Sequence, residues 1–241
     1  MAYNTTATTS FNLDLNEIVE EAFERCGAEL RTGYELRTAK RSLNLLLLDW
    51  ASRGINLWML ETGTHTLTFD VGTYDLPADT VDLLDHVIRT GTGTNQIDIN
   101  ISRISSSTYV AIPNKNATGR PIQIWIDRRT GANDSTGAVV YPQFTVWPKP
   151  DAGTTYTLFY TRLRRMFDVG TGLSGQDIPF RFLPCMIAGL AYYLSMKIPG
   201  ADVRTQVLKA QYDEAWDIAA GEDREKAPVR FVPRQSFIGG Y

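Results

Sequence analysis

Cysteine and histidine are scarce in this chain, and their scarcity argues against several kinds of site. The 241 residues include two cysteines and two histidines. Cys26 and Cys185 lie far apart, each among apolar neighbours in a helical pattern, so we expect two buried free thiols rather than a disulfide. His65 and His86 fall in different predicted strands with no cysteine nearby, which argues against a zinc site. We expect no metal and no other cofactor.

Long apolar runs and a surplus of basic residues are also missing. No stretch approaches the roughly 20 apolar residues of a membrane helix, so we expect no membrane contact. The N-terminus is polar and rich in threonine, unlike a secretory signal, and we interpret residues 1–12 as a flexible arm. With 24 basic and 27 acidic residues the net charge is −3, whereas proteins that grip DNA phosphates carry a basic excess. Tight DNA binding is therefore not expected.

One glycine-rich segment, Gly170-Thr-Gly172-Leu-Ser-Gly175, matches the G-x-G-x-x-G pattern of dinucleotide sites. In those sites the last glycine lies inside a helix that is followed by a parallel strand. Here Gln176–Pro179 separate the glycines from the next predicted helix, and a second helix follows it. We interpret the segment as a loop.

The sequence also gives little evidence for a catalytic site. No Gly-x-Ser-x-Gly elbow is present, and neither histidine lies in a predicted loop, where catalytic residues usually occur. Two pairs of acids, Asp82 with Asp85 and Asp75 with Asp79, have the residue types of a glycosidase. They are not distinguishable from ordinary acids of turns and strand ends. The sequence predicts that the chain is not an enzyme.

Apolar residues recur at helical spacing in four segments, two at each end of the chain. Asp14 and Glu17 form a capping box before the first segment, and Gly27 is its natural end. The predicted helices cover residues 14–27, 34–52, 179–197 and 202–220.

Between the helix pairs the apolar period changes to two, which indicates strands. The predicted strands cover residues 64–69, 74–77, 81–89, 96–101, 121–129, 139–147 and 154–162, with one short helix at 105–112. We predict an α+β fold. Residues 13–62 and 178–223 would form a helical domain, and residues 63–177 an inserted antiparallel β-sandwich or half-barrel.

The C-terminal segment, residues 224–241, has two prolines and no period but retains many apolar residues. Solvated disordered tails seldom contain such residues, and here they alternate with arginines. We predict a segment that docks on a partner chain, with packing against its own domain as the alternative. The docking residues would be Arg230, Phe231, Val232, Pro233, Arg234, Phe237, Ile238 and Tyr241.

Five further residues are candidates for contacts between subunits. Trp58 and Met59 follow the second predicted helix, and Arg162, Arg164 and Arg165 close the last predicted strand. Such a basic cluster pairs with acids or with a neighbouring subunit more often than with DNA.

Several motifs, in this order, resemble a known family. They are Leu43-Asn-Leu-Leu-Leu-Leu-Asp-Trp50 with Arg53–Leu57, Tyr74-Asp-Leu-Pro77, Ile101-Ser-Arg-Ile-Ser105, Gly119-Arg-Pro121, Val146-Trp-Pro-Lys-Pro150, Tyr156–Tyr160, Ala188-Gly-Leu-Ala191 and Tyr212-Asp-Glu-Ala215. Together they are similar to the podovirus head-to-tail adaptors, also called tail tubular protein A. The match runs through most of the chain.

The resemblance implies a structural ring protein of a tailed bacteriophage virion, with assembly in the host cytoplasm. Family members form dodecameric rings beneath the portal. Helices make the ring body, the β domain meets the tail nozzle or fibres, and the C-terminal segment reaches the portal or an adjacent subunit. DNA would pass through the ring without sequence-specific binding, and an acidic protein suits that passage because like charges repel phosphate.

Two other interpretations stay open. The strands could form a fibre-attachment or carbohydrate-binding module, with Trp125, Trp147 and Tyr141 stacking on sugars, although core packing explains these aromatics as well. Alternatively, one of the carboxylate pairs could serve a hydrolase that acts on polysaccharide or phosphate.

Overall fold

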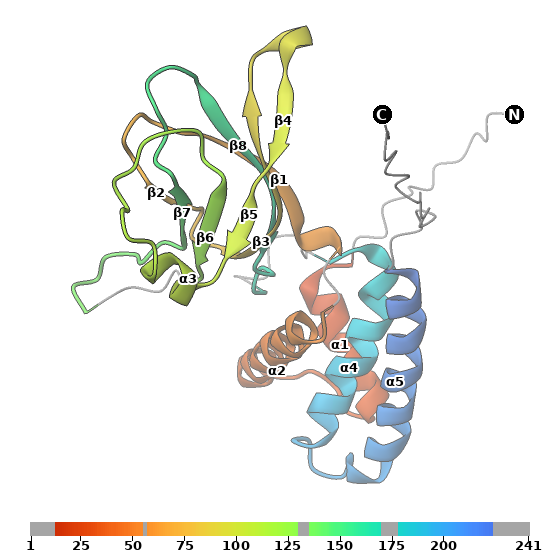
Figure 1. The fold of residues 1–241 in the computed structure, drawn as a ribbon. Coiled ribbons are helices and arrows are strands. Elements are labelled where there is room, and N and C mark those ends of the chain that lie inside the picture. Colours follow the sequence, from red (N-terminus) through yellow and green to blue (C-terminus); the bar gives the residue numbers. More distant parts are fainter. Residues whose placement is uncertain (1–12, 55–56, 130–134, 170–177, 224–241) are drawn as a thin grey trace, which may run out of the picture.

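The computed structural model describes residues 13–54, 57–129, 135–169 and 178–223. Helices from both ends of the chain pack together, and the strands from its middle form a separate part beside them (Figure 1). The α+β class is confirmed, and each part has its own cluster of buried apolar residues. The predicted N-terminal arm, the glycine-rich segment 170–175 and the C-terminal segment 224–241 lie outside the described residues.

Four helices build the helical part as described. Their bounds are α1 Leu15–Cys26, α2 Gly33–Ser52, α4 Leu183–Ser195 and α5 Thr205–Glu222. The 3-10 turns η3 (Phe180–Phe182) and η4 (Asp202–Arg204) precede α4 and α5. These two α-helices therefore begin later than the sequence pattern predicts. Every helix within the described ranges is too short or too polar to span a membrane.

Helix caps explain where the first two helices start. The capping box of Asp14 and Glu17 is present at α1, and Gly27 ends the helix with a left-handed φ of 79°. A second capping box, made by Thr32 and Glu35, starts α2 at Gly33. The helix predicted from the apolar period lacks this second box and starts one residue later, at Tyr34.

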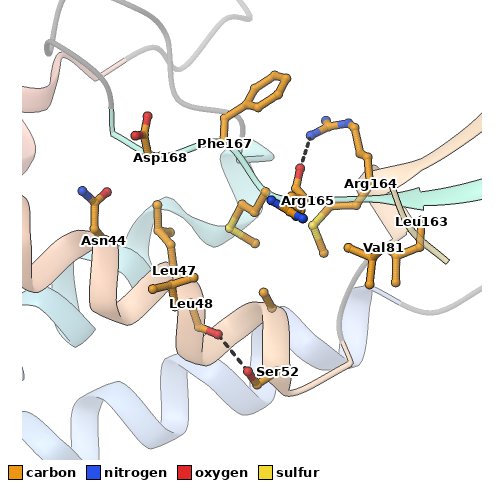
Figure 2. A pocket seen from close by; sticks show the side chains of 13 residues that line it. Asn44, Leu47, Leu48, Ser52, Val81, Leu163, Arg164, Arg165, Phe167 and Asp168 are labelled. Carbon is orange, nitrogen blue, oxygen red and sulfur yellow. Dashed lines mark hydrogen bonds between the residues drawn. The ribbon is translucent and has the colours of Figure 1, made fainter. Parts of the chain in front are cut away.

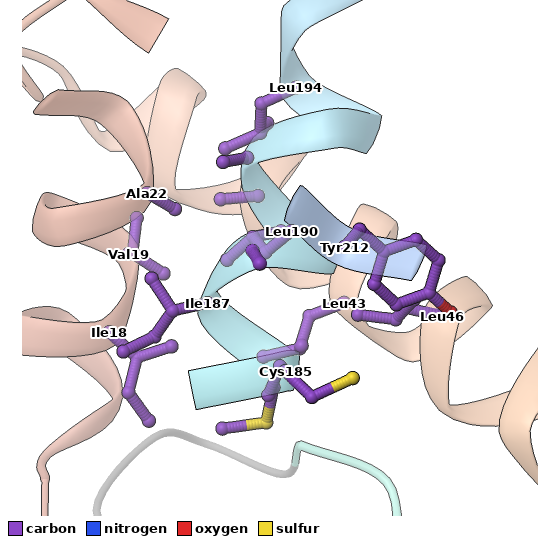
Figure 3. Packing of buried hydrophobic residues seen from close by; sticks show 14 of the residues in the cluster. Ile18, Val19, Ala22, Leu43, Leu46, Cys185, Ile187, Leu190, Leu194 and Tyr212 are labelled. Atoms are coloured by element: carbon purple, nitrogen blue, oxygen red, sulfur yellow. The ribbon is translucent and has the colours of Figure 1, made fainter. Parts of the chain in front are cut away.

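The central helix of the bundle is α4. Ten of its 13 residues are buried, because α1, α2 and α5 all pack against it. Figure 3 shows side chains from these three helices converging on α4. At Gly189 a β-carbon would lie 2.9 Å from both Leu46 Cδ2 and Tyr212 Cε2, so the glycine permits the close approach of α2 and α5. The Trp50 indole on α2 also donates a hydrogen bond of 2.9 Å to the Tyr212 hydroxyl.

The inserted part contains two four-stranded sheets that share one apolar cluster. The first has the order β1-β8-β3-β4 and the second β2-β7-β6-β5. The strands are β1 Leu60–Thr66, β2 Thr73–Asp75, β3 Thr80–Thr90, β4 Ile97–Asn100, β5 Ser102–Ile104, β6 Gln123–Asp127, β7 Gln143–Trp147 and β8 Tyr156–Arg164. The remaining short elements are η1 Leu57–Met59, η2 Gly93–Asn95 and α3 Ser106–Val110.

Two features of the strands differ from the predicted pattern. The first strand begins at Leu60 rather than at residue 64, and Gly63 lies under the ring of Tyr160, where a β-carbon would be 2.6 Å from Tyr160 Cζ. Because Gly63 has no side chain, it interrupts the alternation of apolar and polar residues that would indicate a strand here. In addition, β5 was not predicted, and it pairs with β6 in parallel, whereas the other strand pairs are antiparallel.

Candidate docking site at the junction of helices and strands

The chain leaves the first sheet through β8 and then runs along α2. Asn44 of α2 holds this segment in place, because its side-chain oxygen accepts a hydrogen bond of 3.0 Å from the backbone of Val169. Val169 is buried and Met166 packs against the helical core, while Phe167 between them is 58% exposed. The exit segment is therefore anchored at two points and presents an aromatic ring outward.

A groove of about 450 Å³ lies between this exit segment and α2 (Figure 2). Its lining is mostly apolar and combines α2, η1, the start of β3 and the end of β8. The residues are Asn44, Leu47, Leu48, Ala51, Ser52, Met59, Val81, Leu163, Arg164, Arg165, Met166, Phe167 and Asp168. Among them Leu48 is 64% and Val81 is 38% exposed. An exposed apolar hollow of this kind is typical of an interaction site.

An ionic network adjoins the groove at Arg164, which belongs to both. The Arg162 guanidinium lies 2.6 Å from Asp79 Oδ1 and 2.7 Å from Glu61 Oε2. The Arg164 guanidinium lies 2.8 Å from the other oxygen of Glu61. The two arginine side chains are 12% and 8% exposed. Burial favours the neutral form of Asp79, but the hydrogen bonds and charge of Arg162 hold the pKa of its carboxyl below the usual value.

Arg165 differs from its two neighbours because its side chain is exposed. Its backbone nitrogen donates a hydrogen bond of 2.7 Å to the carbonyl of Asp79, and its own carbonyl accepts one from Arg164. The guanidinium of Arg164 also lies 4.7 Å from the centre of the Phe167 ring. The end of β8 is thus held by both its backbone and its side chains.

The other predicted interface residues pack inside the chain. Trp58 lies against the ring of Phe182 at a centroid distance of 4.9 Å, and Met59 is 2% exposed. The indole nitrogen of Trp58 is buried, and no residue of the described ranges pairs with it.

The end of α5 is tied to the same junction. The buried carboxylate of Asp223 pairs with Arg181 in η3, and its second oxygen lies 3.5 Å from the backbone nitrogen of Leu57 in η1. This contact places Asp223, the residue that caps the end of α5, beside the start of the strands. Residues 224–241, which contain the predicted docking residues Arg230 to Tyr241, follow directly from that point in the sequence.

The structure therefore brings Met59, Arg164 and Arg165 together at one groove, with Arg162 in the adjoining network. Sequence analysis missed the apolar residues of this groove, Leu48, Val81 and Phe167. One signal was available for Leu48. In the run Leu45–Leu48 the helical period turns Leu46 and Leu47 to the core, so Leu45 and Leu48 must face outward.

Three of the four acids considered for catalysis, Asp75, Asp79 and Asp82, have structural partners instead. Asp82 pairs with Arg103 at 2.8 Å, and Asp75 accepts a hydrogen bond of 2.8 Å from Gln143. Burial lowers the pKa of both His65 and His86, which favours their neutral forms. Within the described ranges no cluster of histidine, cysteine and acidic residues is arranged to hold a metal ion.

The two tryptophans considered for sugar binding are also engaged within the chain, whereas Tyr141 is 42% exposed. Trp125 stacks on Tyr109 with ring centres 5.0 Å apart, and the Trp147 indole donates to the carbonyl of Asn114 at 2.9 Å. Packing and hydrogen bonding thus account for both tryptophans.

Residues 13–232 of the chain match the family model of the SU10 adaptor protein. The chain belongs to the SU10 adaptor protein family. Because the match covers the helices and the inserted strands alike, it confirms the resemblance to phage head-to-tail adaptors. A comparison with curated proteins gives no match.

Membership of the SU10 adaptor family makes the chain a structural protein of a phage virion, with other virion proteins as its binding partners. The family is not catalytic, so the hydrolase interpretation is wrong. The apolar groove, with the network of Arg162 and Arg164 beside it, therefore lies on the surface of a protein that binds other proteins.

Proposed function

We propose that the chain forms a dodecameric ring between the portal and the tail nozzle of the virion, and that DNA leaves the head through this ring. The helical part would form the ring body, and the strands would face the nozzle or the tail fibres. The chain would assemble in the host cytoplasm and remain at the head-to-tail junction.

The observation that carries this proposal is the placement of exposed apolar side chains. Most of the large apolar residues that are more than half exposed in the described ranges lie on the helical part and at the junction groove. They are Tyr34, Leu45, Leu48, Phe167, Phe180, Met196, Val203, Val207 and Ile218, whereas Phe69, Ile97 and Val110 lie on the inserted part. Soluble monomers rarely expose so many apolar groups over adjoining elements, and such surfaces normally contact other proteins. A ring subunit needs surfaces of this kind because each copy contacts two neighbours and further virion proteins.

The C-terminal segment and the net charge fit the same proposal. Residues 224–241 start at the junction and carry aromatic residues alternating with arginines, as a segment that docks on the portal requires. The net charge of −3 disfavours tight binding of DNA, so DNA can slide through the ring without sequence-specific contacts.

Mass photometry of the purified chain, alone and mixed with the portal protein of the same virus, tests the proposal. We expect the chain alone to be monomeric or weakly associated, because the C-terminal segment finds its partner only on the portal. The mixture should contain a discrete complex of one portal ring with a dodecamer of the chain. The absence of any complex would contradict placement at the portal, and a stable dodecamer without portal would contradict portal-dependent assembly.

A further inference from the structure

The outward face of α2 carries a continuous stripe of unusual composition. Side chains at positions i, i+3, i+7, i+11 and i+14 share one side of a helix. In α2 they are Tyr34, Arg37, Arg41, Leu45 and Leu48, which we call the α2 stripe. Tyr34, Leu45 and Leu48 are 66%, 54% and 64% exposed. A purely solvated helix face seldom combines three large apolar side chains.

The two arginines of the α2 stripe are available for a partner. Arg37 and Arg41 are exposed, and neither forms a salt bridge with any residue that the structure describes. Together with Tyr34 and Lys40 they line a shallow hollow. The Arg41 guanidinium donates only a long hydrogen bond of 3.4 Å to the Thr38 hydroxyl. An acidic side chain entering this hollow would therefore meet two guanidinium groups that have no ion pair with a described residue.

The outward face of α5 has the complementary composition. Its exposed apolar residues are Val207 at 59% and Ile218 at 66%, and Val203 in the preceding turn is 85% exposed. Between them Glu214 and Asp217 are exposed and have no salt-bridge partner within the described ranges. We call these five residues the α5 stripe. Beside it, a hollow of about 450 Å³ includes Ala188, Glu214 and Ile218 in its lining.

The two stripes match in length as well as in charge. Each has apolar residues at its ends and charged residues of one sign in between. At a rise of 1.5 Å per residue, Tyr34 to Leu48 spans about 21 Å. The part of the α5 stripe that lies within the helix, Val207 to Ile218, spans about 17 Å, and Val203 in η4 extends it. Opposite charges flanked by apolar contacts are the arrangement that sets register and partner choice between packed helices.

Within one chain the stripes cannot meet. The buried faces of α2 and α5 both turn toward α4, which lies between the two helices (Figure 1). The outward faces therefore point in different directions. Two different surfaces of one subunit that fit each other generate a head-to-tail contact, and such a contact produces a closed ring when its rotation closes.

We propose that the α2 stripe of one copy docks on the α5 stripe of the next copy, and that this contact repeats around the ring. The inference rests on the proposed ring and adds the two surfaces that build it. Arg37 and Arg41 of one copy would pair with Glu214 and Asp217 of its neighbour.

Charge reversal on each face, separately and together, tests this assignment. One variant carries Arg37→Glu and Arg41→Glu, and the other carries Glu214→Lys and Asp217→Lys. Each variant alone places like charges across every contact. A mixture of the two restores opposite charges everywhere if the copies alternate, which a ring with an even number of subunits allows.

The readout is the yield of infectious particles when the variants are supplied to host cells infected by virus that lacks the wild-type chain. We expect each variant alone to lower the yield by at least about tenfold, since like charges across an interface cost several kcal/mol. Both variants together should restore most of the wild-type yield. Glu20→Lys with Glu24→Lys, two exposed acids of α1 that lie outside both stripes, is the matched control and should leave the yield unchanged.

Thermal unfolding of each purified variant shows that lost yield does not come from misfolding. The assignment is overturned if either variant alone supports a wild-type yield, or if two folded variants fail to restore it together. The second outcome would mean that the α2 stripe binds the C-terminal segment or another virion protein. Failure of the proposed function has a different signature, because the wild-type chain would then be absent from purified particles.

Discussion

The carboxylate of Asp223 pairs with the guanidinium of Arg181 and joins the end of α5 to the turn that precedes α4. The Asp223 side chain has no exposed surface, whereas that of Arg181 is 34% exposed. The same carboxylate lies within 3.5 Å of the backbone nitrogen of Leu57. One side chain thus links three segments where the helices meet the strands.

Replacing Asp223 by alanine should destabilise the fold, because Arg181 and the Leu57 N–H would lose their acceptor. We expect the free energy of unfolding to fall by about 2 kcal/mol, as for other hydrogen bonds to charged groups. Urea denaturation followed by circular dichroism measures the change. Asp213→Ala, at an exposed position of α5, is the control and should change stability by less than about 0.5 kcal/mol. Equal effects of the two substitutions would show that the Asp223 contact is not structural.

Two glycines of the helical part should respond in opposite ways to alanine. Gly189→Ala would press a methyl group against Leu46 and Tyr212 and should cost about 1–3 kcal/mol of unfolding free energy. At Gly221 a β-carbon meets no atom within 4 Å, so alanine should stabilise α5 by about 0.5 kcal/mol through its helix propensity. The unfolding midpoints of both variants check this pair. A harmless Gly189→Ala would mean that α2 and α5 are packed less closely around α4.

The buried thiols and Tyr212 should make stability fall at alkaline pH. Burial raises the pKa of Cys26 to about 11, and those of Cys185 and Tyr212 to about 12. The same groups titrate near 9.0 for the thiols and 10.0 for the tyrosine when unperturbed. From pH 9 upward the folded chain therefore keeps protons that the unfolded chain releases, and the free energy of unfolding decreases.

Urea denaturation between pH 7 and pH 10 should show this decrease, and Cys26→Ala with Cys185→Ala should reduce its slope. A thiol reagent at pH 8 should label both cysteines slowly in the folded chain and rapidly in urea. Fast labelling of the folded chain would contradict the burial of these thiols.

Deleting residues 224–241 should leave the fold intact and abolish docking on the portal. The expected result is an unchanged unfolding midpoint together with the loss of the portal complex in mass photometry. Serine at Phe231, Phe237 and Tyr241 in the full-length chain is the finer variant, and it should weaken docking without shortening the segment. If the deletion unfolds the protein, the segment belongs to the core of its own chain.

The helices could be predicted because their signals are local. Asp14 and Glu17 lie one turn apart, and the apolar period of α2 and α4 needs no knowledge of the rest of the fold. The positions of several strands followed from alternation in the same way. The pairing of β5 with β6 could not be predicted, because it depends on a partner strand 21 residues away, as Ser102 opposite Gln123 shows.

The residues at the junction of helices and strands could be predicted from the sequence only in part. The sequence drew attention to Arg162, Arg164 and Arg165, but it did not identify Glu61 and Asp79 as their partners, because these acids lie far along the chain. The groove itself arises where β8 runs past α2, so its apolar residues share no sequence motif. Long-range packing decides which side chains such a groove contains.

The register of β1 and β8 has a consequence for how this protein can change in evolution. Leu60 and Leu163 are paired across the two strands where the chain enters and leaves the inserted part. Opposite residues of antiparallel strands lie about 5 Å apart, so the insert joins the helices through two neighbouring ends. Loops and strands far from this pair can lengthen, shorten or be exchanged without moving α2 or α4. Relatives can therefore keep one helical body while the insert adapts to different partners in the virion.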